Sequence, residues 1–282
     1  MTRTSSKDRR ALANLTALSV AVLSLLLVSG LVAAQQGKDR RDDAAHLVQT
    51  TRLLNRSVKF VERERTGEIT TLYIDPGTGL VPFGVLTFQA FFGIVDKACI
   101  LSVPWPEVQF DSQTKLFFIR EITTDEATCL TYNPDVHETI RASRAGKIFA
   151  YYGIENLLDR RRQRTDGDYQ GQIYDLARLT NIPVCRQETR IGRAERYYMS
   201  LESGMVRMVL IHRDGEPKQD GNYLLVPFPL LQFDAAQVAY HLDLDTAALS
   251  KAPRFAHFDD AYLSREQVAE IYRSFGLEDY LE

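Results

Sequence analysis

The sequence has few of the residues that build metal centres and disulfide frameworks. Its 282 residues include three cysteines and five histidines, and neither Cys-x-x-Cys nor His-x-x-x-His spacing occurs. Zinc sites depend on such spacings, so none is expected. The chain also lacks a Gly-x-Ser-x-Gly nucleophile elbow and a phosphate-binding glycine loop before a helix. We therefore predict no catalytic residue, no metal site and no cofactor.

Three residues could be mistaken for metal ligands. His241, Asp243 and Asp245 alternate along the chain, which places them on one face of a strand. No further ligand cluster accompanies them at suitable spacing, so a solvated strand face is favoured over a metal site. The segment His257–Asp260 is also read structurally, because acidic residues are stabilised just before a helix such as the last predicted one.

An excess of positive charge is missing as well. The 34 Lys and Arg residues are outnumbered by 37 Asp and Glu residues, giving a formal net charge of −3. The run Asp159–Asp168 contains several arginines, but for so short a stretch a solvated linker is favoured over a basic patch. Nucleic-acid binding depends on a basic surface, so we expect no nucleic-acid partner.

The N-terminus carries the one long uncharged run. Ala11–Ala34 follows four basic residues and closes on the small residues Val32-Ala33-Ala34, which is typical of a secretory signal peptide cleaved after Ala34. Its 24 residues could also span a bilayer as a retained anchor, but several helix-weakening residues within it favour cleavage. The Arg9-Arg10 pair leaves a twin-arginine signal open.

Export would leave an acidic protein in an oxidising compartment. Without residues 1–34 the net charge is −6, and we expect a periplasmic or cell-envelope location, with membrane contact only if the segment is retained. Three cysteines leave at least one thiol unpaired. A Cys99–Cys129 disulfide and a pair of small buried thiols both stay open, because spacing does not give the Cα distance. The fate of Cys185 also stays open.

An internal repeat defines the domain organisation. The frame Val-Pro-aromatic-Pro-x-x-Gln-Phe-Asp occurs as Val103–Asp111 and, 123 positions later, as Val226–Asp234. Ile148–Gly153 and Ile271–Gly276 repeat at the same offset, so we predict a duplicated domain. A flexible tether would cover residues 35–48, the first domain 49–153, a charged linker 154–171 and the second domain 172–282.

Each copy is expected to contain short strands followed by a short helix. The turn Asp75–Gly79 predicts a hairpin of Glu68–Ile74 with Leu80–Phe88. In the second copy the corresponding hairpin joins Glu195–Leu201 to Met205–Ile211. The helices are expected around Ala142–Tyr152 and after a capping box at Ser264–Gln267. This content favours a mainly β protein with a small closed barrel in each copy.

Both copies resemble the PRC-barrel, a small β-barrel domain of the photosynthetic reaction centre H subunit and of a ribosome maturation factor. The residues that carry the resemblance are Gly67–Ile69, Asp75–Gly79, Phe91–Lys97, Val103–Trp105 and Phe110-Asp111, then Gly192, Gly204, Val226–Phe228, Phe233-Asp234 and Lys251–Phe255. It implies two tandem small PRC-like β-barrels, each with a short C-terminal helix, after the signal or anchor helix. It also implies a binding or assembly module without known catalytic residues.

The two copies differ in one predicted loop. Phe91–Lys97 is rich in apolar residues, whereas the second copy has the polar stretch Arg213–Asn222. Clustered aromatic residues in a loop mark a contact surface, although they could instead fold back over the barrel end or pack against the second barrel. We predict that a protein partner binds this loop, through Phe91, Phe92, Gly93, Ile94, Asp96 and Lys97.

Two other functions remain open. The cleft between the barrels could bind a small ligand or hold an enzymatic site, which a concave polar pocket with a perturbed ionisable group would indicate. A purely structural envelope component is a third possibility. Trp105, the only tryptophan, is assigned to the core because Phe228 takes its place in the repeat.

N-terminal sequencing of the exported protein checks the prediction that the signal peptide is cleaved after Ala34. The mature chain should begin at Gln35. A chain that still begins at residue 1 or 2 and sediments with membranes would show instead that the segment is a permanent anchor.

Overall fold

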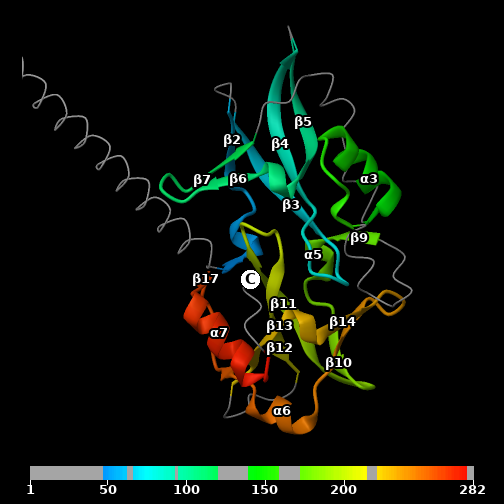
Figure 1. Cartoon of the computed structure of the whole chain (residues 1–282), viewed down its shortest axis with the longest axis vertical. Helices are drawn as coiled ribbons and strands as arrows, with labels where there is room; N and C mark the ends of the chain where they lie inside the picture. Colours follow the sequence, from blue (N-terminus) through cyan, green and yellow to red (C-terminus); the bar gives the residue numbers. More distant parts are fainter. Residues whose placement is uncertain are drawn as a thin grey trace, which may run out of the picture. The chain divides into compact units, whose positions relative to one another are not determined.

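Strands dominate the structure, a computed structural model that describes residues 47–61, 66–92, 95–119, 139–158, 172–214 and 221–277 (Figure 1). These residues belong to one unit, Ala45–Glu282. They form two sheets, one of them curled into a half-barrel, so the mainly β class is confirmed. Residues 1–46, with the predicted signal peptide and most of the tether, lie outside the described part. None of the described helices is long and apolar enough to cross a membrane.

The first sheet has eight strands in the path β5-β4-β3-β2-β7-β6, with β9 paired to β3 and β8 paired to β9. Their bounds are β2 (Ser57–Phe60), β3 (Thr66–Ile74), β4 (Phe83–Phe92), β5 (Val95–Pro104), β6 (Gln109–Asp111), β7 (Leu116–Ile119), β8 (Thr139–Arg141) and β9 (Gln172–Asp175).

The second sheet has nine strands in the path β14-β15-β10-β11-β12-β13-β16, with β1 paired to β11 and to β17. Their bounds are β1 (Leu47–Gln49), β10 (Pro183–Arg186), β11 (Thr189–Ser200), β12 (Val206–Arg213), β13 (Tyr223–Pro227), β14 (Leu231–Asp234), β15 (Ala239–Leu242), β16 (Arg254–Phe255) and β17 (Tyr262–Leu263).

Short helices connect the strands. They are η1 (Thr50–Arg52), η2 (Trp105–Glu107), α3 (Ala142–Tyr151), α5 (Leu176–Leu179), η3 (Phe228–Leu230), α6 (Thr246–Lys251) and α7 (Arg265–Ser274). The capping box is confirmed, since the Ser264 hydroxyl accepts from the Gln267 amide and the Gln267 side chain accepts from the Ser264 amide. Both predicted hairpins and both predicted helices are present.

The same pairings recur in the two sheets. The parallel pair β2–β7, with Val58 opposite Phe117, recurs as β10–β15, with Val184 opposite Tyr240. The β3–β4 hairpin shifts register around Thr70, and the β11–β12 hairpin does so around Glu195. Left-handed backbone also recurs at equivalent positions: Asn55 and Asn181, Gly79 and Gly204, Lys115 and Val238, Gly153 and Gly276. The repeated sequence therefore has a counterpart in repeated strand pairing.

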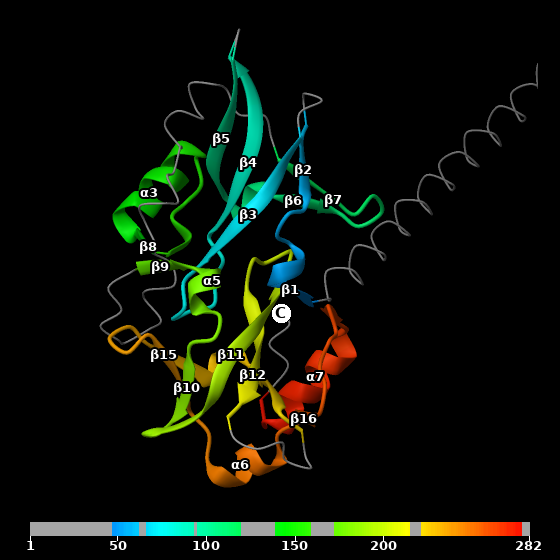
Figure 2. The same ribbon diagram turned by 180° about the vertical axis from the view of Figure 1, so that it is seen from behind.

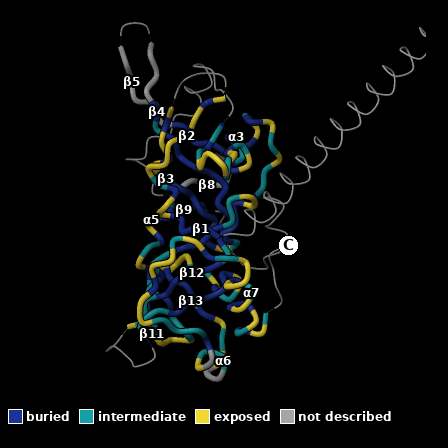
Figure 3. The backbone as a smooth tube through the Cα atoms, turned by 90° about the vertical axis from the view of Figure 1, so that its left-hand side faces the viewer, coloured by how far each residue is buried: buried dark blue, intermediate teal, exposed yellow. Residues whose placement is uncertain are grey.

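Each copy places its first strand in the sheet of the other copy. Strand β1 lies between β11 and β17, with Val48 opposite Met199 and Tyr262. Strand β9 lies between β3 and β8, with Tyr174 opposite Ile74 and Thr139. Leu47 and Val48, which the sequence analysis included in the tether, thus belong to the second sheet. Buried residues lie along β1, β9, β12 and β13 (Figure 3).

A reciprocal contact joins the two hairpin turns. The amide of Val81 donates to the carbonyl of Gly204 over 2.8 Å, and the amide of Val206 donates to the carbonyl of Gly79 over 2.8 Å. Leu80 and Met205 form an isolated antiparallel bridge between these bonds. Because the residues of each pair occupy equivalent positions in the two copies, the contact is close to two-fold symmetric.

Each turn glycine also makes room for an aromatic ring of the other copy. A Cβ atom on Gly204 would lie 2.6 Å from Cδ1 of Trp105, and one on Gly79 would lie 2.8 Å from Cδ1 of Phe228. Trp105 is 3% exposed, which confirms its place in the core. Its indole Nε1 donates to the carbonyl of Leu201 over 2.8 Å.

Replacing Gly204 tests this contact. Gly204→Ala adds a Cβ at φ +65° and against Trp105, whereas Gly153→Ala adds one at φ +67° with nothing within 4 Å. The left-handed conformation should cost each variant about 1–2 kcal/mol, and overpacking should cost Gly204→Ala about 1–3 kcal/mol more. Urea unfolding measures both. Equal losses in the two variants would mean that the Trp105 contact is not tight.

Candidate functional site

The segment predicted to bind a partner is the far end of a long hairpin. Phe91 and Phe92 belong to β4, and Asp96 and Lys97 belong to β5. The prediction of a loop is wrong at these four positions, because the strands continue pairing through them. Phe91 and Phe92 have the strand preference of aromatic residues. Gly93-Ile94, at the tip, lies outside the described residues.

The end of this hairpin extends past the neighbouring strand. Strand β3 pairs with β4 only as far as Phe88, opposite Gly67. Beyond that point Gln89–Phe92 pairs with Val95–Ala98 in a two-stranded ribbon of four residue pairs. The ribbon projects past β2 and α3 at the top of the chain (Figures 1 and 2). Among the described strands, none pairs with the β3-facing edge of this ribbon.

The second copy has no such ribbon in the described residues. There the last pair of the equivalent hairpin is His212 opposite Tyr223, and β12 ends one residue later, at Arg213. The two copies therefore differ at the position where the sequence analysis expected a difference. The difference is that β4 and β5 extend further than β12 and β13.

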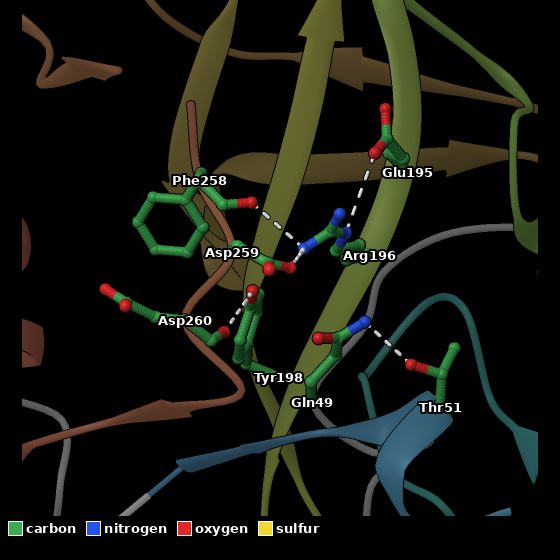
Figure 4. Close-up of polar contacts among 8 residues, drawn as sticks. All are labelled: Gln49, Thr51, Glu195, Arg196, Tyr198, Phe258, Asp259 and Asp260. Carbon is green, nitrogen blue, oxygen red and sulfur yellow. Dashed lines mark hydrogen bonds and ion pairs between the residues drawn. The ribbon is translucent and has the colours of Figure 1, made fainter. Parts of the chain in front are cut away.

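Polar contacts join β11 to the segment before α7, which contains Phe258, Asp259 and Asp260 (Figure 4). Arg196 on β11 donates from Nη1 to the carbonyl of Phe258 over 2.9 Å and pairs with Asp259 at 3.3 Å. The Tyr198 hydroxyl donates to the carbonyl of Asp260 over 3.0 Å, and burial raises the pKa of Tyr198 to about 12. These contacts fasten the segment to β11, in agreement with its structural interpretation.

An open pocket of about 590 Å³ lies beside β10 and β15. Its lining includes the three residues weighed as metal ligands and the side chain of Arg186, whose Nε donates to the carbonyl of Leu244 over 2.8 Å. His241 lies 3.6 Å from the carboxylate of Asp234, and Asp245 caps α6. The backbone amide of Gln237 is the main cause that lowers the pKa of Asp234. Within the described residues, no three potential ligands converge on a metal position.

A smaller pocket of about 260 Å³ lies where the copies meet, between η1, β3 and α5. It is lined by Thr50, Thr51, Leu54, Thr70, Thr71, Leu72, Asp175, Leu176, Ala177, Thr180 and Asn181. Asp175 is the one ionisable residue in this lining, and burial raises its pKa, whereas the Ala177 amide and the charge of Arg178 lower it. Sequence reasoning missed this pocket, because its walls come from segments that the repeat does not show to be neighbours.

Cys185 is a free thiol of intermediate exposure. The side chain of Cys99 and the whole of Cys129 lie outside the described residues, so the disulfide alternative stays a prediction. No family model matches the chain, and none of the curated proteins matches its sequence.

The raised pKa of Tyr198 predicts a pH dependence of stability. A phenol whose pKa lies at about 12 in the folded state and near 10 in the unfolded chain stabilises the fold below pH 10 and loses that contribution as the pH rises toward 12. Tyr198→Phe also removes the bond to Asp260, at a cost of about 1 kcal/mol. The gap in unfolding free energy between wild type and Tyr198→Phe should thus narrow between pH 9 and pH 12 in denaturant titrations. A constant gap would contradict the raised pKa.

Proposed function

We propose that the chain is a non-catalytic protein-interaction or assembly module of the cell envelope, built from two PRC-like barrels. The observation that carries the proposal is the projecting β4–β5 ribbon, which one copy has and the described part of the other lacks. An extension confined to one of two otherwise matching hairpins is not needed for the fold that both share. We therefore assign it to contact with a partner.

The barrel assignment is supported by three observations. The strand pairings recur in both copies, one sheet is curled into a half-barrel, and the sequence resembles the PRC-barrel in both copies. The proposed bounds are residues 49–153 and 172–282, with the first strands exchanged. Export through residues 1–34 belongs to the same proposal and is supported by the sequence pattern alone.

The ribbon offers a partner two kinds of contact. A strand edge without a neighbour presents backbone amides and carbonyls that a partner strand can pair with. Its sequence also concentrates Phe91, Phe92 and Val95, and aromatic residues supply much of the binding energy at protein interfaces. Backbone pairing would give affinity, and the apolar residues would give selectivity for an equally apolar partner segment.

A second candidate function is binding of a small ligand between the copies. The pocket at Asp175 is concave, lies at the junction of the copies and contains a carboxyl group of raised pKa. The sequence analysis set a concave polar pocket with a perturbed ionisable group as the sign of a cleft site. This pocket contains such a group, but its lining is mainly apolar. The two functions use different surfaces and do not exclude each other.

Serine substitutions test the ribbon. The double variant Phe91→Ser, Phe92→Ser should lose at least about tenfold in recovery of the envelope partner when a photo-crosslinking residue is placed at Gln89. The loss is expected because truncating two interface aromatics removes several kcal/mol of binding energy. The melting temperature should change little, because β3 pairs with β4 only as far as Phe88, and Phe91 and Phe92 pair with β5 alone.

The matched control replaces two exposed apolar side chains outside the ribbon. Val61 is 64% exposed and Tyr262 is 57% exposed, so Val61→Ser with Tyr262→Ser tests general loss of surface apolarity. Recovery should stay at the wild-type level in this control. Equal recovery from both double variants would remove the ribbon as the binding site.

A further inference from the structure

The lining of the pocket between η1, β3 and α5 has an apolar part and a polar part. One part is apolar and consists of Leu54, Leu72 and Leu176, which we term the leucine wall. The other part is a group of threonine hydroxyls with a single carboxylate, Asp175. No lysine, arginine, histidine or glutamate lines the pocket, so the one formal charge in its lining is negative. The positive charge of Arg178, beside this lining, acts on Asp175 from outside it.

One oxygen of the Asp175 carboxylate is hydrogen-bonded within the protein. Its Oδ1 accepts from the Ala177 amide over 2.9 Å and thereby caps α5. Its Oδ2 accepts no hydrogen bond from the described residues. A carboxylate oxygen that is half-buried beside apolar walls gains most from a charged donor, because charge-assisted hydrogen bonds are the strong ones.

Three of the five threonine hydroxyls in the lining make hydrogen bonds within the protein. Thr51 Oγ1 accepts from Gln49 Nε2 over 2.6 Å, and Thr180 Oγ1 donates to the carbonyl of Leu176 over 3.2 Å. Thr70 Oγ1 lies 3.3 Å from the carbonyl of Val85. The Asp175 carboxylate is the one charged acceptor in this lining.

The equivalent strand of the other copy carries bulkier residues. At the positions of Thr70, Thr71 and Leu72 on β3, strand β11 has Glu195, Arg196 and Tyr197, according to the matching register of the two hairpins. There Arg196 pairs with Glu195 at 3.6 Å and bonds to the segment before α7 (Figure 4). Thr70 and Thr71, which are smaller than Glu195 and Arg196, thus lie on the side with the pocket.

Resting on the second candidate function above, we propose that this pocket binds a small alkylammonium group, with the nitrogen at the Asp175 carboxylate and the alkyl chain against the leucine wall. Such a group joins one positive charge to a short apolar chain, which matches the one negative charge and the apolar area of the lining. A free amine and a lysine side chain of a partner share this chemistry.

Saturation-transfer NMR titrations of the full chain test the proposal. The probes are n-butylamine, 1-butanol and butyrate at pH 7, which share an alkyl chain and differ in charge. Butylamine should bind at least about tenfold more tightly than butanol, and butyrate should not bind. Nα-acetyl-lysine methylamide, tested in parallel, distinguishes a protein-borne lysine from a free amine: it binds like butylamine only if the pocket admits a side chain.

The decisive variant is Asp175→Asn. Asparagine caps helices as well as aspartate does, so the fold should be kept while the charge is lost, and butylamine binding should weaken at least about tenfold. Asp245→Asn is the matched control, because Asp245 caps α6 and does not line this pocket; butylamine should bind it as it binds wild type.

A third variant guards against misfolding of Asp175→Asn. Thr71→Leu narrows the pocket from β3 without altering the carboxylate, and it should also abolish butylamine binding while the melting temperature stays within a few degrees. Two results would overturn the proposal: no butylamine binding at tens of millimolar, or equal binding of butylamine and butanol that survives both substitutions.

Discussion

The two copies are held together at a contact in which an aromatic ring of each copy packs against a turn glycine of the other. Trp105 and Phe228 stand at equivalent positions of the repeat, and each packs against the turn glycine of the opposite copy, Gly204 or Gly79. Burying a large aromatic side chain stabilises a protein by about 1.5–3 kcal/mol, so the pair contributes a large share of typical domain stability. Any side chain at either glycine would push the turns apart. That displacement would disturb the exchange of β1 and β9, and with it the pocket between η1, β3 and α5.

Within this near-symmetric frame, the candidate sites lie where the copies differ. The ribbon extends one hairpin, and Thr70–Leu72 keeps one side of the junction open where Glu195–Tyr197 carries bulkier side chains. Equivalent structural parts, such as the parallel pairs β2–β7 and β10–β15, are retained in both copies. Shared features thus account for the fold, while the differences mark the surfaces that we assign to a partner and a ligand.

Local features were predictable from the sequence, and long-range ones were not. The repeated frame, both hairpins and the capping box at Ser264 each have a short-range signal, and the structure contains all of them. The exchange of β1 and β9 has none, because three or four residues do not specify which of two similar sheets they join. The ribbon was taken for a loop because the polar stretch Arg213–Asn222 stands at its place in the second copy. The Asp175 pocket was missed because its walls meet only through the exchange of β1 and β9.

The position of β1 bears on how the chain would respond to a pulling force. Leu47–Gln49 is the first described strand, yet it pairs with β11 and β17 of the second sheet. Tension transmitted from the N-terminal side would therefore load the second sheet before it reached β2 and the first. Detaching β1 would open a strand edge in the second sheet while the first kept its own pairings.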